Sequence, residues 1–325
     1  MSSWAEVRRY LRTNRYELAT GFPAALADTP LLSRPSWVPA APVPLSALDI
    51  SLQSAPSWDL PAAPGDPAYA SYSAAIAERD APTFFENRPT WRLVDADLAG
   101  PAPRLVFGDG WYFDSIDTGE AAAHEYAAAR LDGTPTPLRD AVGDPTDLTR
   151  RPANMAVSAL TVRQDPAGDQ FLLHWRDPAK VGHAGGLYQV VPVGVFQSSG
   201  PDDFDLWRFM LREYAEELLG EPEVEAPDYG TWPFAKAMTS ALTDGHITAD
   251  VLGLGVDPLT FATDLLVRVI VEAPVFDELF GARVAVNDEG AVSTRPFTQD
   301  SIDGLPMQAA GAALVRLALA AGPTR

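Results

Sequence analysis

The stretch Arg212-Glu213-Tyr214-Ala215-Glu216-Glu217, with a glycine soon after it at position 220, decides the fold of the second half of the chain. It lies within a predicted helix from Phe204 to Leu219. At the helical repeat, one stripe of this helix is apolar and faces a core: Trp207, Met210, Leu211, Tyr214 and Leu218. Glu213, Glu216 and Glu217 fall on a separate patch, so three carboxylates lie on one side of the helix.

This acidic patch favours a hard divalent cation. Like charges three and four residues apart on a helix repel by about 0.2 to 0.5 kcal/mol per pair, and a bound cation relieves that repulsion. Magnesium binds through one or two carboxylates and takes its other ligands from water and phosphate oxygens. We therefore predict a metal site at Glu213, Glu216 and Glu217 that serves a phosphorylated ligand. The alternative is a solvated helix face, because acidic runs are frequent in a protein this acidic.

Predicted strands precede the acidic helix, and a strand and a helix follow it. Alternating and apolar runs predict strands from Ala156 to Arg163 and from Gln170 to Trp175. Residues 185–195 predict a third strand and a glycine-containing loop. Further on we expect a long buried strand at 261–271, a turn at 287–290 and a closing amphipathic helix at 307–319.

This order of elements, with Gly-Leu-Tyr at 186–188 and Pro-Val-Gly at 192–194, resembles the Nudix hydrolase pattern. The resemblance covers about Asn154 to Ala320, with an apparent insertion around Glu221 to Leu252. It implies an α+β protein in which a Nudix-like mixed-sheet α/β/α sandwich at residues 151–325 follows a smaller α+β N-terminal domain at residues 1–150. We place the boundary in the turn-rich segment 132–152.

In the Nudix family the loop-helix-loop binds divalent metal and cleaves the pyrophosphate bond of a nucleoside diphosphate linked to another group. Gly194 matches the glycine that opens the family's box. The box arginine and its later glutamates are matched by Arg212, Glu213, Glu216 and Glu217. The resemblance thus implies catalysis with Mg2+ (or Mn2+) held by the three glutamates, while Arg212 orients a carboxylate.

Three further residues belong to the predicted site. An acidic residue from a late loop often supplies another ligand or the base in this family, and Glu289 is the candidate here. Arg176 and Lys180, at the end of the second strand, would hold the phosphates of a nucleotide-type small molecule. Pairing of these two cations with surface acids such as Asp177 is an equally good interpretation.

The chain departs from the Nudix box at two places. Pro192-Val193-Gly194 replaces the usual Pro-Gly-Gly, and Gly200 stands where the box has a glutamate. Asp203 or Asp205 could replace the lost acid, although neither has the expected offset. A second hypothesis therefore stays open, a catalytically lapsed Nudix-like sensor of a nucleotide metabolite, or a regulatory or scaffold protein. A structural interaction protein without a ligand is the third.

The first half carries fewer signals. A proline-rich segment from Pro23 to Pro67 predicts an extended wrap over a domain surface, anchored by Trp37 and Trp58, with a free linker as the alternative. A hairpin is expected from strands at 104–107 and 111–113 about a Gly-Asp-Gly turn. Helices at 69–79 and 119–131 and a strand at 91–95 complete the prediction.

Composition limits the partners. The 325 residues carry a net charge of −20 and no cysteine, so any metal is held by oxygen or imidazole. The charge argues against broad binding of nucleic acid. In the first helix, Arg8, Arg9, Arg12 and Arg15 are interpreted as a solvated face rather than a nucleic-acid patch. No membrane span or signal peptide is apparent, so we expect a cytoplasmic protein, and a homodimer stays open.

Overall fold

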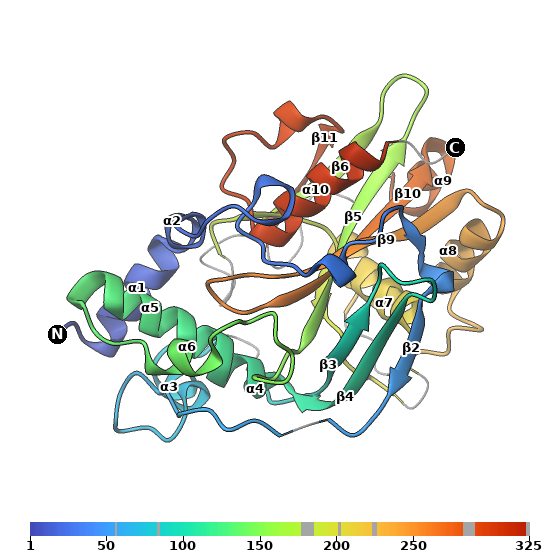
Figure 1. The fold of residues 1–325 in the computed structure, drawn as a ribbon. Coiled ribbons are helices and arrows are strands. Elements are labelled where there is room, and N and C mark those ends of the chain that lie inside the picture. The colour runs from blue at the N-terminus through green and yellow to red at the C-terminus, as the bar shows by residue number, and fades with distance from the viewer. Residues whose placement is uncertain are drawn as a thin grey trace.

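A mixed β-sheet runs through the middle of the molecule (Figure 1). The structure is a computed structural model that describes residues 1–55, 57–82, 85–176, 185–200, 203–222, 226–281 and 290–322. Within these ranges the strands of the sheet are β1 (Val43–Pro44), β5 (Met155–Gln164), β6 (Gln170–Arg176), β7 (Tyr188–Val190), β8 (Val193–Val195), β9 (Ile247–Val256), β10 (Thr263–Glu272) and β11 (Gly290–Pro296). Their order is β1-β9-β10-β5-β6-β11, with β7 beside β6 and β8 beside β5. The sheet is mixed because β5 and β10 are parallel, whereas β9 and β10 are antiparallel.

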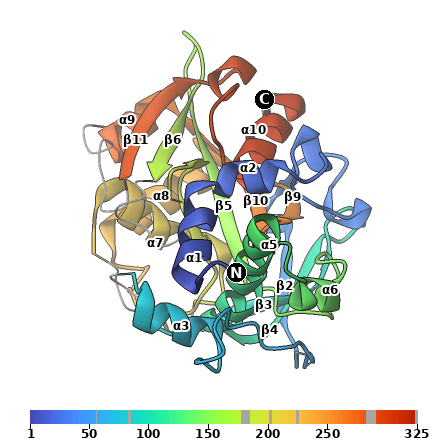
Figure 2. The same ribbon diagram turned by 90° about the vertical axis from the view of Figure 1, so that its left-hand side faces the viewer.

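Helices cover both faces of this sheet (Figure 2). One face carries α7 (Leu206–Leu219), α8 (Pro233–Thr243) and α9 (Ala273–Leu279), and the other carries α10 (Ala309–Ala321). Side chains alternate between the faces along each strand. Leu172 of β6 accordingly packs in the core with α7, while Phe171 and Leu173 pack in the core with α10. The predicted α/β/α sandwich with a mixed sheet is confirmed.

β9 begins inside the segment from Glu221 to Leu252, where an insertion was predicted, and lies between β1 and β10 in the sheet. The insertion itself stays a prediction. Gly253 and Gly255 interrupt the apolar run of this strand, so the local pattern does not predict it. One of them, Gly255, is required by packing. A Cβ at that position would lie 2.3 Å from Cδ2 of Leu31, which sits against the strand.

A second sheet is formed by the first half of the chain, with β4 (Arg104–Trp111) between β2 (Asp49–Leu52) and β3 (Pro89–Asp97). The hairpin predicted within 104–113 is wrong, since β4 continues through the Gly-Asp-Gly sequence and pairs with β3. The glycine at position 108 allows another part of the chain to pack closely against β4, and it does not form a turn. A Cβ at Gly108 would lie 2.4 Å from that of Ala55.

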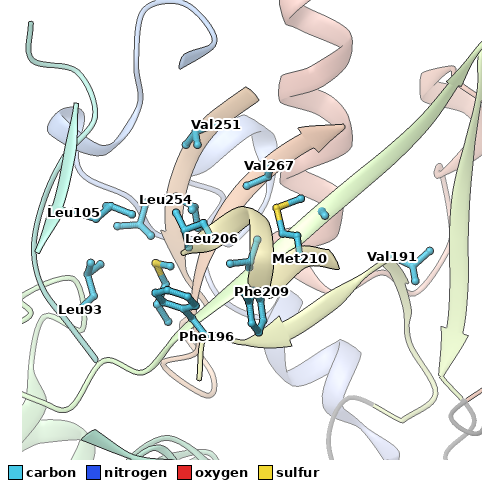
Figure 3. Packing of buried hydrophobic residues seen from close by; sticks show 14 of the residues in the cluster. Leu93, Leu105, Val191, Phe196, Leu206, Phe209, Met210, Val251, Leu254 and Val267 are labelled. Carbon is cyan, nitrogen blue, oxygen red and sulfur yellow. The ribbon is translucent and has the colours of Figure 1, made fainter. Parts of the chain in front are cut away.

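The core of the small sheet is continuous with the core under α7 (Figure 3). Leu93 and Leu105 of the small sheet are buried in one cluster with Phe196, Leu206 and Phe209. The domain boundary near residue 150 therefore stays a prediction, although apolar side chains from both sides of it share one interior. No helix in the described part of the chain is long and apolar enough to cross a membrane.

The proline-rich segment is an anchored wrap, as predicted, and the free-linker alternative is wrong. It contains the short helices η1 (Leu26–Asp28), η2 (Pro35–Trp37) and η3 (Leu45–Ala47). Trp37 is only 2% exposed, and the backbone of Leu32 pairs with that of Val256 in β9. The Arg92 guanidinium lies 4.3 Å from the ring centroid of Trp58, a cation–π contact that holds the later part of the wrap.

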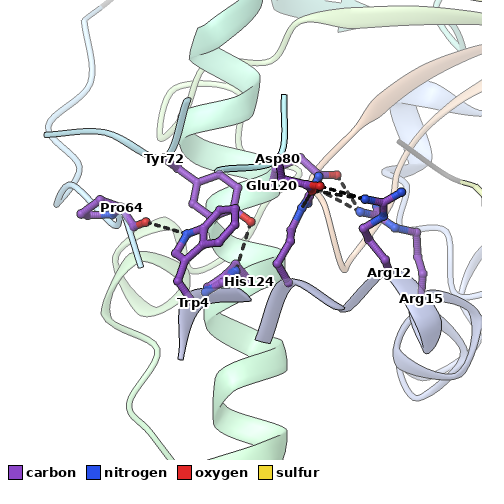
Figure 4. A network of polar contacts seen from close by, with 9 residues as sticks. Trp4, Arg12, Arg15, Pro64, Tyr72, Asp80, Glu120 and His124 are labelled. Atoms are coloured by element: carbon purple, nitrogen blue, oxygen red, sulfur yellow. Dashed lines mark hydrogen bonds and ion pairs between the residues drawn. The ribbon is translucent and has the colours of Figure 1, made fainter. Parts of the chain in front are cut away.

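The remaining helices gather around the N-terminus. They are α1 (Trp4–Thr13), α2 (Arg15–Thr20), α3 (Tyr72–Arg79), α4 (Tyr112–Ser115), the π-helical turn η4 (Ile116–Glu120), α5 (Ala121–Asp132) and α6 (Pro137–Val142), while η6 (Gln299–Ser301) precedes α10. Figure 4 shows the polar network between them. Arg8 and Arg15 donate to the Glu120 carboxylate at 2.8 and 2.9 Å, and all three side chains are buried. The predicted solvated face is therefore wrong for these two arginines, because their partner lies more than a hundred residues away.

Candidate functional site

The acidic helix α7 begins and ends as its sequence suggests. Asp205 caps the N-terminus, where its Oδ1 accepts a hydrogen bond from the backbone N–H of Arg208 at 2.9 Å. Gly220 ends the helix in the left-handed conformation, with a φ of 67°. Asp205 therefore acts as a helix cap. Its side-chain hydrogen bond to Arg208 is made at the start of α7 and gives no support for its replacing the missing box acid.

The structure brings together Gly194 and Glu213, the two residues that match the opening glycine and the first of the three later glutamates of the family's box. Gly194 lies in β8, opposite Val157 of β5. A Cβ at position 194 would lie 2.1 Å from Oε2 of Glu213. Only glycine therefore lets this half-buried carboxylate lie directly on the strand.

Glu217 has a structural role in the described part of the chain. It is 8% exposed, and its Oε1 accepts a hydrogen bond from the backbone N–H of Val193 at 2.9 Å. Its Oε2 lies 3.7 Å from Nδ1 of His174, a fully buried histidine on β6. The Glu217 carboxylate thus connects the C-terminal part of α7 to the first residue of β8, Val193, and to His174 on β6.

Glu216 differs from both, because it is exposed to solvent. The three glutamates occupy an open, a half-buried and a buried position, and the described residues contain no group of three or more His, Asp or Glu side chains that could hold a metal ion. This donor set does not fit a magnesium ion held by all three. The metal assignment therefore stays a prediction.

Arg212 is buried and faces the loop before the helix. Its Nη2 donates to the carbonyl oxygen of Gln197 at 2.9 Å and lies 3.5 Å from Oδ2 of Asp203. Asp203 also accepts hydrogen bonds from the backbone N–H of Ser199 and from the Tyr229 hydroxyl, each at 2.9 Å. Burial alone would raise the pKa of Asp203, but the bonds from Ser199 and the charge of Arg212 hold that pKa below its usual value. Arg212 orients a carboxylate here, and that carboxylate fastens a loop.

Two polar residues accompany these carboxylates on the sheet. Arg176 is two residues from His174 along β6, so its side chain leaves the strand on the face that α7 covers. Gln189 of β7 lies directly opposite His174 and is 2% exposed. Sequence reasoning proposed Arg176 but missed Gln189, because a lone glutamine in a short strand carries no motif. Two predicted site residues, Lys180 and Glu289, lie outside the described residues. The same holds for residues 287–289 of the predicted turn at 287–290.

We call the five residues His174, Arg176, Gln189, Glu213 and Glu217 the α7-face cluster. Its members come from β6, β7 and α7. The sheet side contributes hydrogen-bond donors, while the helix side contributes carboxylates. Such an arrangement suits a polar ligand that presents acceptor oxygens to the sheet.

Known proteins resemble this chain only at the level of solved structures. No family model matches the chain, and no curated protein matches it. Among solved structures, the chain is similar to Shewanella oneidensis NrtR at 14% identity and a TM-score of 0.33, covering 50% of this chain and 60% of that one. A second NrtR structure, which is complexed with a 27mer DNA, gives a TM-score of 0.32 at 14% identity and covers 50% of this chain and 59% of that chain.

A mutT/nudix family protein from Listeria innocua is similar at 15% identity and a TM-score of 0.30, over 53% of this chain and 95% of that chain. A NUDIX hydrolase from Alicyclobacillus acidocaldarius is similar at 15% identity and a TM-score of 0.31, over 50% of this chain and 90% of that chain. At such TM-scores these structures transfer no residue role to this chain, and the chain spans only about three-fifths of NrtR.

Proposed function

We propose that this protein binds a nucleotide-type metabolite at the α7-face cluster and acts as a Nudix-like sensor or scaffold, without the standard metal-dependent hydrolysis. The observation that carries the proposal is the position of Glu217. A carboxylate that accepts the N–H of Val193 and adjoins buried His174 already has its role inside the fold. Turning it toward a metal would leave that N–H without its acceptor, at a cost of about 1 to 3 kcal/mol.

Two further features support the proposal. Gly200 occupies the place of the missing box glutamate, so one acid of the reaction is absent from the sequence. Arg212, the box arginine, is bound to Gln197 and Asp203 in the loop before α7. Both features favour a box that is kept for the architecture of the loop and helix.

Hydrolysis with Mg2+ (or Mn2+) is the second candidate, and one observation favours it. Gly194 brings Glu213 onto the strand, as in the predicted box, and Glu216 on the same helix is exposed. Two carboxylates are enough for a magnesium ion that takes its other ligands from water and phosphate.

The deciding experiment uses the full chain with Mg2+ or Mn2+ and a panel of nucleoside diphosphate conjugates. Turnover is measured beside ligand-induced thermal stabilisation, for the wild type and for Glu213→Gln, Glu216→Gln and Arg176→Ala. We expect stabilisation without turnover, and loss of that stabilisation in Arg176→Ala, because a removed guanidinium no longer meets the phosphates. Turnover that disappears in both glutamine variants would overturn the proposal in favour of the hydrolase.

A further inference from the structure

Gln189 holds a buried donor that the described residues leave without a hydrogen-bond partner. Its side chain is 2% exposed, and Nε2 has no hydrogen-bond partner within the part of the chain that the structure describes. A buried amide in this state destabilises the fold, because no hydrogen bond offsets the loss of its hydration. Such a position persists where the group serves another purpose.

The contrast with Thr161 on the same face of the sheet is informative. The Thr161 hydroxyl is fully buried as well, but it bonds to the carbonyl oxygen of Val191 and to the hydroxyl of Tyr214, each at 2.8 Å. The face beneath α7 can therefore satisfy a buried polar group with its own residues. At Gln189 it does not.

The surroundings of Gln189 point to the group that would satisfy it. His174 lies directly opposite on β6, and Arg176 is the diagonal neighbour on the same face. Diagonal neighbours on a sheet are about 7 to 8 Å apart, which long side chains can bridge. An amide N–H and a guanidinium that reach one region from the sheet suit a ligand group with several acceptor oxygens.

We propose that Gln189 is the specificity-determining residue of the α7-face cluster and donates its Nε2 hydrogen bond to a phosphate oxygen of the bound metabolite. The inference rests on the proposed function, because it names the ligand group that the same cluster reads. A phosphate accepts a hydrogen bond from the amide donor and attracts the Arg176 guanidinium. A nucleoside without phosphate offers no such acceptor oxygens.

Two variants at position 189 distinguish a role in ligand recognition from a role in stabilising the fold. Gln189→Met keeps the length of the side chain and removes the donor, whereas Gln189→Glu keeps the shape and puts a carboxylate where the phosphate would lie. Thr161→Val is the matched control, since it removes a buried polar group that has its partners. The probes are ADP, inorganic pyrophosphate and adenosine, with affinity measured by calorimetry and stability by thermal unfolding.

We expect ADP and pyrophosphate to bind the wild type and adenosine to bind at least tenfold more weakly. Gln189→Met should weaken ADP by roughly three- to tenfold, the value of one hydrogen bond, and Gln189→Glu should abolish binding. Gln189→Met should also raise Tm by about 2 °C or more, because the unsatisfied donor is gone. Thr161→Val should lower Tm and leave ADP affinity within twofold.

The outcomes distinguish the two levels of the proposal. If the wild type binds ADP but Gln189→Met binds it equally well, the role of Gln189 is refuted while the proposed function stands. If the wild type binds none of the probes, the proposed function fails. In that case the inference about Gln189 fails as well, because it names the ligand group of that same site.

Discussion

Glu216 and Glu217 are neighbours in the chain with opposite surroundings. Glu216 is exposed, and Glu217 is buried against Val193 and His174. One hundred degrees of helix rotation separates them, which is enough to turn one into solvent and the other into the sheet. A motif written as Glu-Glu therefore contains one surface residue and one interior residue, and their substitutions should differ.

Glu217→Ala should lower the free energy of unfolding by about 1 to 3 kcal/mol, since it leaves the N–H of Val193 without its acceptor. Glu216→Ala should change it by about 0.5 kcal/mol or less, as is usual for an exposed position. Urea denaturation of both variants measures the difference. Equal effects would show that Glu217 does not have the structural role described above.

The contact between Gly194 and Glu213 can be tested by a double-mutant cycle. Gly194→Ala should cost about 1 to 3 kcal/mol, because its new Cβ must displace the Glu213 carboxylate. In a Glu213→Ala background the same substitution should cost at least about 0.5 kcal/mol less. Urea denaturation of the four proteins provides the cycle, and identical costs in the two backgrounds would contradict the contact.

At the level of elements, the π-helical turn η4 joins the N-terminal helices to the sheet. Glu120 binds Arg8 of α1 and Arg15 of α2, and Asp117 accepts the backbone N–H of Ser73 in α3 at 2.6 Å. Gly119 in the same turn lies against the β9–β10 loop, where a Cβ would come within 2.0 Å of the Thr260 carbonyl oxygen. One turn of helix thus makes contacts with three helices and with the loop between β9 and β10.

Glu120→Gln should destabilise the protein by about 3 to 5 kcal/mol, because two buried guanidinium groups lose their shared carboxylate. Arg12→Ala is the control from the same network. Its side chain is 37% exposed and bonds Asp80 at 3.0 Å, so its removal should cost about 1 kcal/mol or less. Chemical denaturation distinguishes these values, and comparable losses would mean that burial does not strengthen the Glu120 contacts.

For the whole molecule, the shared core has a consequence for the division of the chain. Leu93 and Leu105 from the first half pack in one cluster with Leu206 and Val267 from the second. A fragment that begins at residue 151 would expose the apolar surface that these two leucines cover. The two halves predicted from the sequence thus depend on each other for burial.

We therefore expect the full chain to unfold in one cooperative thermal transition. Residues 151–325 expressed alone should show a broadened transition at lower temperature, because their half of the interior has lost its cover. Circular dichroism during heating measures both. A fragment with the Tm of the full chain would establish an independent second domain.

The pH dependence of stability should reflect a buried acid. Burial raises the pKa of Asp264 to about 6, against the hydrogen bond from Ser158 that lowers it. The native state then keeps this proton to higher pH than the unfolded state does, so stability falls as pH rises from about 4 to 6, by about 3 kcal/mol at most. Asp264→Asn should match the wild type at pH 4 and exceed its stability at pH 7.

His124 changes stability in the opposite direction over the same interval, and the comparison of variants removes its effect. Burial lowers the pKa of His124 to about 4, so the stability that it contributes rises with pH between that value and its ordinary pKa. This contribution is the same in the wild type and in Asp264→Asn. Urea denaturation at both pH values should therefore isolate Asp264, and a difference between the two proteins that does not change with pH would contradict its titration.

Local pattern was sufficient for the elements of the second half. The strands at β5 and β6 and the helix α7 were predicted within a few residues, because alternation and the helical repeat are properties of adjacent residues. The family resemblance, and not these local signals, assigned Gly194 and Glu213 to one box. Local signals failed at β9 and β4. There, glycines make room for Leu31 and Ala55, which come from distant parts of the chain.

Tertiary structure decided the surroundings of each polar group. The pairing of Arg8 and Arg15 with Glu120 and the hydrogen bond from Val193 to buried Glu217 depend on residues far from each other in the chain. Burial and hydrogen bonding are set by what packs against a side chain, and no repeat along the sequence encodes that neighbour. The acidic helix could thus be predicted from the sequence, whereas the role of each of its carboxylates was determined only by the sheet against which the helix packs.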